Sequence, residues 1–352
     1  MRIGIIGGGI QGLGVALSLS DAGHQVVVFE AEDKFASKAS ANSLKIIHGG
    51  FRYLQTLNIS RLIRSLSAQA MVAKKFPEFV KPLPCLMPLS RSGLKSKYPV
   101  MAAALFYSIL KFFFGGKNIS SPKVISKEEA LTRCPFAREI FKDEVLLWYD
   151  LQLTSHEKLC ESILSDLTKK GVSLLSSKRV LKIETLNDDV GLIKVTTEGG
   201  EDYGFDKVVV ASGYQSLDGK ENESIEAMNI VFNKAIDSEC AVGFQSDSGR
   251  LFFLVPRGER SALGTEYFKI GKDPKEAGEI LLKEAAQVWR QLLDLLPTEF
   301  EMEIGTLPAR KGKAAEKDSF AWLQKNVLQV VPAKYTTFLS VGEKVKKFIE
   351  KK

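Results

Sequence analysis

The chain has 352 residues, of which 45% are hydrophobic and 26% are charged, and its formal net charge is +7. These proportions are ordinary for a globular protein and exclude wholesale disorder, while the length predicts two structural units. The mild and scattered excess of Lys and Arg favours an anionic surface or substrate over a nucleic acid as partner. Four distant cysteines without a C-x-x-C pair and three scattered histidines predict reduced cytosolic thiols, with neither a disulfide framework nor a metal site.

The first 30 residues predict a dinucleotide-binding βαβ unit. A short buried strand, residues 2–6, leads into a turn that satisfies G-x-G-x-x-G, and a helix and a second buried strand, residues 26–29, follow. The first glycine permits the tight turn, the second lets backbone approach a pyrophosphate, and the third lets the helix pack closely on the strand. An acidic residue ending the second strand is placed to accept ribose hydroxyls, which disfavours NADP. The predicted binding residues are Gly7, Gly9, Gln11, Gly12 and Glu30.

Residues 100–114 form the longest apolar stretch of the chain. The stretch contains Lys111 and falls short of a bilayer span, and the apolar start of the chain is too short for a secretion signal, so we expect no membrane-crossing segment. It is helix-like and apolar nearly all round, with lysines on both sides. Two interpretations stay open: a buried core helix, or a helix that lies on a membrane surface containing anionic lipids.

The later elements predict that one domain is interleaved with another. An amphipathic helix at 156–170 and strands at 172–176, 178–184 and 206–213 return the chain to the N-terminal domain. Strand signals between 230 and 255 and a long helix at 274–295 are typical of an antiparallel sheet covered by helices. We place the first domain at residues 1–82, 146–215 and 303–352, and the second at 83–145 and 216–302.

The segment between residues 37 and 54 resembles a known family. Ser37, Ser40 and Ser43 precede Lys45 and the run I-I-H-G-G-F-R-Y-L. This pattern is similar to the S-x-x-S-x-x-S-x-K-L-I-H-G-G-x-R-Y-L signature of FAD-dependent glycerol-3-phosphate dehydrogenases, within the D-amino-acid-oxidase-like (DAO) superfamily of FAD-dependent oxidoreductases. Weaker similarity covers the strand 208–213, a P…GT hairpin at 255–265 and a K-x-T-T turn at 334–337.

The resemblance implies that the dinucleotide is FAD and that its flavin lies between the domains, against residues 43–50. We therefore expect an α/β protein in which a Rossmann-type FAD-binding domain is interleaved with an antiparallel α+β substrate domain. The further cofactor-binding residues that the resemblance implies are Ser43, Lys45, Gly49, Val180, Gly213, Lys334 and Thr336.

Three of the matching residues are candidates for catalysis. His48 is the candidate general base, since imidazole accepts a proton near neutral pH. Arg52 is the candidate for holding an anionic group on the substrate. Lys334, at the expected start of a last helix at 335–347, would stabilise negative charge on the reduced flavin. A core histidine, a surface ion pair and a solvated lysine are the respective structural alternatives.

Two departures from the family pattern bear on the substrate. Leu307 stands where the family has a substrate-binding arginine, and Pro332 and Ala333 replace the two glycines before Lys334. The charge missing at position 307 can come from another arginine, and the sequence does not rank the candidates. They are Arg257, Arg260 and Arg310.

The expected function is oxidation of a small anionic alcohol, such as glycerol 3-phosphate, by hydride transfer to flavin. The alternatives are an amino-acid or 2-hydroxy-acid oxidase of the same superfamily, and an inactive FAD-binding subunit. A quinone or another acceptor would take the electrons. We expect a cytoplasmic protein, peripheral at the inner face of a membrane if residues 100–114 meet lipid, that does not bind nucleic acid.

Overall fold

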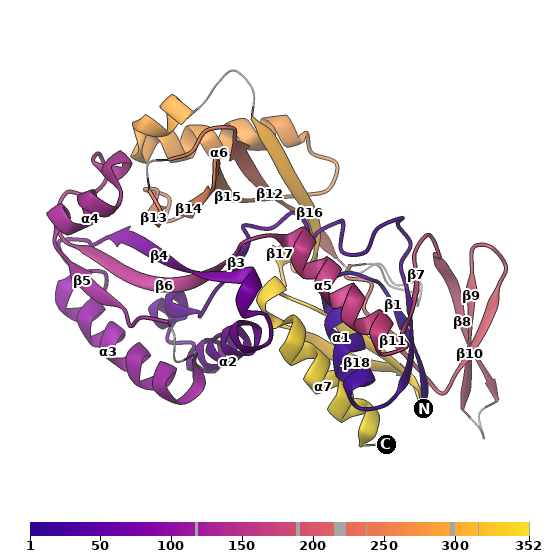
Figure 1. Ribbon diagram of the computed structural model, residues 1–352. Helices are drawn as coiled ribbons and strands as arrows, with labels where there is room; N and C mark the ends of the chain where they lie inside the picture. The colour runs from indigo at the N-terminus through magenta and orange to yellow at the C-terminus, as the bar shows by residue number, and fades with distance from the viewer. Residues whose placement is uncertain are drawn as a thin grey trace. The chain divides into compact units, whose positions relative to one another are not determined.

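The structure is a computed structural model that describes residues 1–116, 119–187, 191–214, 223–236, 238–295, 300–315 and 317–351. The chain forms two compact units, each assembled from separated segments (Figure 1). The first unit comprises Met1–Asn42, Ser155–Glu226 and Gly305–Lys352, and the second comprises Ser43–Thr154 and Ala227–Ile304.

The first unit is built on a six-stranded sheet whose central strand is β1. β1 pairs in parallel with β2 and β11, and β2 and β11 pair in parallel with β7 and β19, while β18 runs antiparallel to β19. These strands are nearly continuous apolar runs because both faces of a parallel sheet are covered. Their bounds are β1 (Arg2–Ile6), β2 (Gln25–Phe29), β7 (Ser173–Leu175), β11 (Lys207–Val210), β18 (Ser319–Gln324) and β19 (Val327–Val331).

Helices cover one face of this sheet and a small antiparallel sheet packs against its strands. α1 lies between α5 and α7 (Figure 1). The three-stranded sheet β10-β9-β8 contributes Ile193, Val195 and Phe205 to a cluster with Phe29 and Val208 of the large sheet. The bounds are α1 (Ile10–Asp21), α5 (His156–Lys169), α7 (Phe338–Glu350), β8 (Val180–Asn187), β9 (Leu192–Thr197) and β10 (Asp202–Phe205).

Two glycines and one histidine hold these helices together. A Cβ on Gly14 of α1 would collide with the carbonyl oxygen of Phe338, and one on Gly342 of α7 would collide with that of Gly14, so the two helices touch backbone to backbone. His156, at the start of α5, lies 3.0 Å from the Ala36 carbonyl through Nε2 and 3.0 Å from the Tyr335 hydroxyl through Nδ1. A carbonyl only accepts, so Nε2 carries the proton and Nδ1 accepts from the tyrosine.

The second unit contains most strands of a larger sheet in the order β16-β12-β15-β14-β13-β4-β6-β3, with β5 paired to β6, while β17, paired to β16, and the end of β16 from Gly305 on belong to the first unit. The registered pairs are antiparallel except for β13 with β4. The α/β fold class with an interleaved α+β unit is therefore confirmed. The bounds are β3 (Ile46–Ile47), β4 (Val80–Pro88), β5 (Lys123–Ile125), β6 (Val145–Leu153), β12 (Ser224–Phe232), β13 (Ala241–Gln245), β14 (Leu251–Arg257), β15 (Arg260–Phe268), β16 (Glu301–Arg310) and β17 (Lys313–Ala314).

Helices lie on both faces of this sheet (Figure 1). α4 and α6 share a core cluster with Leu86, Val242 and Leu254 on one face, and residues of α2 and α3 pack together with η1 on the other. The helical bounds are η1 (Phe51–Thr56), α2 (Ile59–Lys75), η2 (Pro77–Phe79), α3 (Lys97–Phe114), α4 (Lys127–Arg133), η3 (Pro135–Ala137), α6 (Pro274–Val288) and η4 (Arg290–Leu295), while η5 (Tyr335–Thr337) belongs to the first unit and directly precedes α7.

The unit boundaries differ from the predicted domain limits. Residues 43–82 and 146–154 belong to the second unit, whereas we had assigned them to the cofactor domain. The physical reason is strand pairing: β4 pairs with β6 along its full length, and β3 pairs with the end of β6. The expected helix at 274–295 also divides, because Trp289 leaves the helical conformation, with φ −135°, and buries its ring completely.

α3 is the most apolar helix surface that the described residues present. Only Ala104 and Tyr107 are buried along its 18 residues, while Phe112 and Phe113 are 82% and 70% exposed. The interpretation of this stretch as a buried core helix is therefore wrong. By length and composition alone, α3 is the one described helix that is long and apolar enough to cross a membrane.

Candidate functional site

The glycine-rich turn of the first unit is closed on one side and open on the other. Gly7 has φ +107°, and a Cβ there would lie 2.6 Å from the carbonyl oxygen of Ala211. A Cβ on Gly12 would collide with the carbonyl oxygen of Gly7. Around Gly9, by contrast, an added Cβ would meet only the Ser40 hydroxyl, at 3.5 Å. The first and third glycines thus close the turn, and the second leaves its outer backbone open to a ligand.

The carboxylate of Glu30 lies against this turn. One oxygen accepts from the Gly8 amide at 2.9 Å, and the other accepts from the Glu32 amide at 2.9 Å. A carboxylate has about four acceptor positions, so two remain for ribose hydroxyls. Ser40, which the sequence analysis had assigned no contact here, accepts from the Ile10 amide at 3.1 Å in the first turn of α1.

The turn before α7 meets the first turn of α1. The Gln11 side-chain amide donates to the carbonyl oxygen of Lys334 at 2.6 Å, and its own Oε1 is buried without a hydrogen-bond partner among the described residues. Asp318 fixes the same turn by accepting from the Ala333 amide at 2.8 Å and the Thr337 hydroxyl at 3.2 Å. Lys334 is the N-cap of η5, which runs directly into α7 at Phe338, so the last helical segment begins after Lys334 as predicted, with a 3-10 first turn.

The other predicted residues of the first unit lie at the edges of this arrangement. Gly213 follows β11 with φ +73°, two residues after Ala211, which contacts Gly7. Thr336 lies in η5 and is 1% exposed. Val180 begins β8 and is 7% exposed, two residues after Lys178, whose amide donates to the Glu30 carbonyl at 2.8 Å. The predicted dinucleotide residues of this unit therefore gather around one turn.

The signature segment lies entirely in the second unit. Ser43 accepts from the Arg257 guanidinium at 2.7 Å through its carbonyl and from the Lys45 amide at 3.3 Å through its hydroxyl. Lys45 has φ +59°, and its carbonyl accepts from the Leu153 amide at 2.8 Å. His48 is half-buried and follows β3, and Gly49 is buried.

A buried carboxylate lies beneath the signature segment, and the sequence analysis missed it. Asp150 of β6 accepts from the Gly49 amide at 2.6 Å, from the Trp148 indole at 3.1 Å and from the Gln69 amide at 3.5 Å. Burial raises the pKa of Asp150 to about 6, against the three donors and Arg52, which lower it. Its only signal in the sequence is an acidic residue inside the strongly apolar run V-L-L-W-Y-D-L-Q-L.

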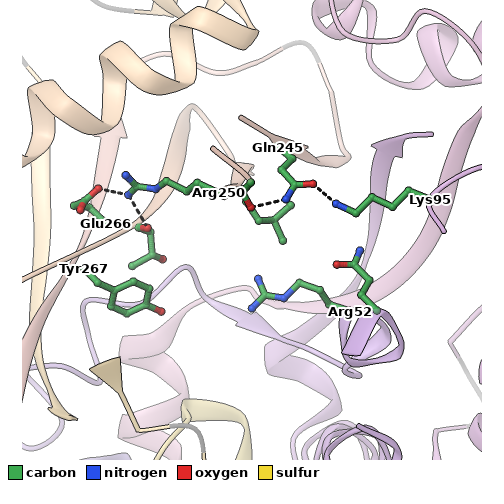
Figure 2. Close-up of a pocket in the computed structure, with 10 residues that line it drawn as sticks. Arg52, Lys95, Gln245, Arg250, Glu266 and Tyr267 are labelled. Carbon is green, nitrogen blue, oxygen red and sulfur yellow. Dashed lines mark hydrogen bonds and ion pairs between the residues drawn. The ribbon is translucent and has the colours of Figure 1, made fainter. Parts of the chain in front are cut away.

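The second unit also contains a pocket of about 400 Å³ (Figure 2). Arg52 and Gln55 of η1 line it together with Lys95 and residues of β13, β14 and β15. Figure 2 shows the Arg52 side chain extending into the pocket toward Tyr267. Arg52 makes no hydrogen bond or ion pair with a described residue. The remaining lining residues are Gln245, Gly249, Arg250, Leu251, Thr265, Glu266 and Tyr267.

The other cations near this pocket are paired to different degrees. Arg250, which the sequence analysis did not single out, pairs with Glu266 and with Glu284. Lys95 donates to the neutral side chain of Gln245, so that hydrogen bond leaves its charge uncompensated.

The three arginines proposed to replace the charge at position 307 differ in their partners and locations. Arg257 binds both carboxylate oxygens of Glu303, at 2.9 and 2.8 Å, and also donates to Ser43. Arg260 pairs with Glu301. Arg310 is exposed and lies in the first unit, near the end of β16. None of the three lines the pocket.

Comparison with known proteins identifies the family. Residues 2–313 match the family described as FAD dependent oxidoreductase (DAO). The chain belongs to this family. Its cofactor is therefore FAD, as the sequence signature had indicated.

Relatives that match along the sequence include aerobic glycerol-3-phosphate dehydrogenases. The Staphylococcus epidermidis protein is 27% identical over 285 residues, and the Staphylococcus aureus protein is 28% identical over 279 residues. Each match covers 74% of this chain and 49% of the relative, so the chain spans about half the length of these relatives.

Solved structures agree in fold. The glycerol-3-phosphate dehydrogenase from Bacillus halodurans complexed with FAD has a TM-score of 0.70 at 18% identity, covering 100% of this chain and 64% of that one. Glycine oxidase from Geobacillus kaustophilus has a TM-score of 0.75 at 15% identity, covering 100% and 95%. Identities this low establish the fold and leave the substrate open.

The first unit of this FAD-dependent oxidoreductase fits the adenosine diphosphate half of its cofactor. The open backbone at Gly9 and the amides at the start of α1 suit a pyrophosphate. The remaining acceptor positions of Glu30 suit the ribose, and the Oε1 of Gln11, buried without a described partner, is an acceptor for a cofactor N–H or O–H donor. FAD, when bound, supplies the redox chemistry.

Replacing Glu30 with alanine is expected to weaken FAD binding by roughly 100-fold or more. The change removes two charge-assisted hydrogen bonds, each contributing about 1.5–3 kcal/mol. Flavin content after gel filtration and the Kd for FAD added to the apoprotein measure the loss. Glu32→Ala is the matched control, because its carboxylate lies in the same loop but pairs outward with Lys38. Protein that purifies without flavin and binds NAD instead would contradict the assignment.

Proposed function

We propose that this flavoprotein dehydrogenates a small anionic alcohol, with glycerol 3-phosphate as the first substrate to test. The observation that carries the proposal is Arg52, a guanidinium extending into a 400 Å³ pocket without a hydrogen bond or ion pair to a described residue. A planar guanidinium binds phosphate or carboxylate through two parallel hydrogen bonds. An arginine that forms no ion pair with a described residue, in a pocket of this size, therefore favours an anionic ligand.

Charge pairing around the pocket supports the same proposal. Arg250 is neutralised by two carboxylates, so it contributes little net charge to a ligand. Lys95 keeps its charge beside Gln245, and it enters the same pocket as Arg52. Two cations that form no ion pair with a described residue suit a dianion such as a phosphate ester better than a zwitterionic amino acid.

The proposed chemistry assigns one task to each side chain. Arg52 binds and orients the anionic group, which fixes the reacting carbon. His48, four residues earlier in the same signature, removes the hydroxyl proton through its imidazole as the carbon loses hydride. Lys334 supplies a fixed positive charge for the negative charge that two-electron reduction leaves on the cofactor. The names of the sequence relatives, aerobic glycerol-3-phosphate dehydrogenases, support the choice of first substrate.

Anaerobic mixing of the flavoprotein with a substrate panel tests this function. Glycerol 3-phosphate or another phosphorylated alcohol is expected to bleach the flavin absorbance within seconds. Bleaching by glycine or another amino acid, or by a 2-hydroxy acid, would select the alternative oxidase function suggested by structural neighbours such as glycine oxidase. Flavin that no metabolite reduces would instead indicate a binding subunit without its own dehydrogenase activity.

We further propose that α3 binds a membrane surface. Its exposed apolar residues occur all along the helix, and Leu94, just before it, is 85% exposed. The helix contains no acidic residue, and lysines lie at both of its ends. Apolar burial and attraction to anionic lipids then act together. Such binding would place the protein at the inner face of a membrane, where a quinone is available as electron acceptor.

Liposome flotation tests the membrane proposal. The protein is expected to float with vesicles containing anionic lipid at low salt, and Phe112→Ser combined with Phe113→Ser is expected to abolish flotation. Ile280→Ser is the control, since Ile280 is a 50% exposed apolar residue on α6 of the same unit. Wild-type protein that stays unbound at low salt, or that covers α3 by forming a dimer, would contradict the proposal.

A further inference from the structure

Two buried side chains form hydrogen bonds to the backbone on both sides of His48. The carbonyl of Ile47, before it, accepts from the Gln69 side-chain amide at 2.8 Å. The amide of Gly49, after it, donates to Asp150 at 2.6 Å. Gln69 is 1% exposed and Asp150 is 7% exposed, and they lie 3.5 Å apart. The two peptide groups that flank His48 are therefore fixed by one connected buried pair.

The space under Gly49 is closed by a third polar side chain. Tyr107 of α3 is 2% exposed, and a Cβ added to Gly49 would collide with its hydroxyl. That hydroxyl has no hydrogen-bond partner among the described residues. A buried polar group without a partner is costly, and such costs are retained mainly where geometry matters for function. The glycine, the phenol and the carboxylate leave the Gly49 peptide no room to shift.

We propose that Asp150 and Gln69 are positioning residues for His48. Asp150 acts through its negative charge on the Gly49 amide, and Gln69 acts by tying Ile47 to the same carboxylate. The proposal rests on the function proposed above for His48, and it explains why a carboxylate is buried in a strand that is otherwise apolar. Gln69 and Asp150 hydrogen-bond to the backbone on either side of His48. Their effect on the reaction is therefore expected to pass through the position of His48.

The groups that face Asp150 determine how it responds to pH. They are Arg52 and Tyr53 of η1, Tyr107 of α3, Cys85 of β4, Gln69 of α2 and Trp148 of β6. Burial raises the pKa of Tyr53, Tyr107 and Cys85, so these three stay neutral near pH 6. Asp150 is thus the group of this cluster whose charge is expected to change near pH 6.

The sign of the pH effect follows from the raised pKa of Asp150, about 6. Above that pH the charged carboxylate accepts a strong hydrogen bond from the Gly49 amide, and below it the neutral carboxyl accepts a weaker one. The limiting rate of flavin reduction is therefore expected to fall as the pH drops through about 6. The free energy of unfolding is expected to rise as the pH drops through about 6, opposite to the rate. The reason is that a carboxyl whose pKa is raised in the folded state favours folding most when it is protonated, below its unfolded pKa.

Three variants test the proposal. Asp150→Asn is expected to lower the limiting reduction rate at pH 7.5 by roughly tenfold, the effect of losing one charge-assisted hydrogen bond, with FAD content unchanged. Its pH profile should lack the Asp150 inflection. Trp148→Phe removes one donor to Asp150 and keeps the Gly49 bond, so it should move the inflection to higher pH. Asp143→Asn, at an exposed ion pair with Arg91, is the control and should match the wild type.

A second measurement does not depend on turnover. The Gly49 amide resonance should titrate with the Asp150 midpoint in the wild type, titrate higher in Trp148→Phe and lose the titration in Asp150→Asn. Since the chain has three histidines, the His48 ring resonance is readily assigned, and Asp150→Asn and Gln69→Leu should broaden it. A Gly49 amide that titrates identically in Asp150→Asn, or a His48 resonance that both variants leave sharp, would overturn the proposal. If no alcohol reduces the flavin but these resonances behave as expected, only the proposed reaction fails.

Discussion

Replacing His48 with alanine is expected to slow reduction of the flavin by substrate by roughly 100- to 10,000-fold, the usual contribution of a general base. The base acts as the hydroxyl proton is lost, so the loss should appear in the limiting rate while the substrate Kd changes little. Stopped-flow measurement of flavin bleaching at several substrate concentrations separates the two quantities. The half-buried position of His48 after β3, between two backbone groups held by Gln69 and Asp150, is the structural reason for this expectation.

His24→Ala is the matched control for this prediction. His24 lies in the first unit, 3.9 Å from Glu350, and its removal should leave the rate of flavin bleaching unchanged. A His48→Ala protein that retains full FAD and reduces it at the wild-type rate would assign the base to another group. Rescue by added imidazole would support the role of His48, because a small base can enter the space left by the side chain.

Replacing Arg52 with alanine is expected to raise the apparent KM by roughly 100-fold with flavin content unchanged. Two parallel hydrogen bonds to an anion contribute about 3 kcal/mol in total at an accessible site, and each 1.36 kcal/mol is a tenfold change. With Leu307 in place of the expected second cation, binding depends more heavily on Arg52. Steady-state kinetics with glycerol 3-phosphate and with an uncharged diol measure the effect, which should be confined to the anion.

Two further variants sharpen the Arg52 prediction. Arg52→Lys should restore only part of the affinity, because an ammonium group keeps the charge but loses the planar pair of donors. Arg91→Ala is the control, since Arg91 is an exposed arginine of the same unit that pairs with Asp143 outside the pocket. An Arg52→Ala protein with an unchanged KM, or a true substrate without charge, would contradict the proposed binding mode.

The sequence alone could predict the cofactor-binding unit because that unit depends on local features of the chain. A buried strand, three spaced glycines, a helix and a terminal acid form one continuous segment, and neighbouring residues determine its geometry. The structure places Gly7, Gly9 and Glu30 around one turn as that segment predicts. The signature at residues 37–54 added the family, and the match over residues 2–313 confirmed it.

Long-range contacts decided what the sequence left open. Residues 43–82 follow the cofactor segment directly, yet β4 pairs with β6, more than 50 residues later, and this pairing assigns them to the other unit. The same pairing brings Asp150 beneath Gly49. The apolar stretch at residues 100–114 is compatible with a core helix or a surface helix, and only the structure shows that Ala104 and Tyr107 are buried while large residues such as Phe112 and Phe113 stay exposed.

By itself, the sequence determined that this protein binds a dinucleotide through an N-terminal βαβ unit and that it resembles FAD-dependent dehydrogenases. Both properties follow from short contiguous motifs. Tertiary structure alone decided which cations are available to a ligand. Three arginines look alike in the sequence but differ in the structure. Arg257 pairs with Glu303, and Arg250 pairs with Glu266 and Glu284, whereas Arg52 forms no ion pair with a described residue. Whether a charge is compensated depends on partners distant in the chain, because Coulomb interactions act through space and not along the sequence.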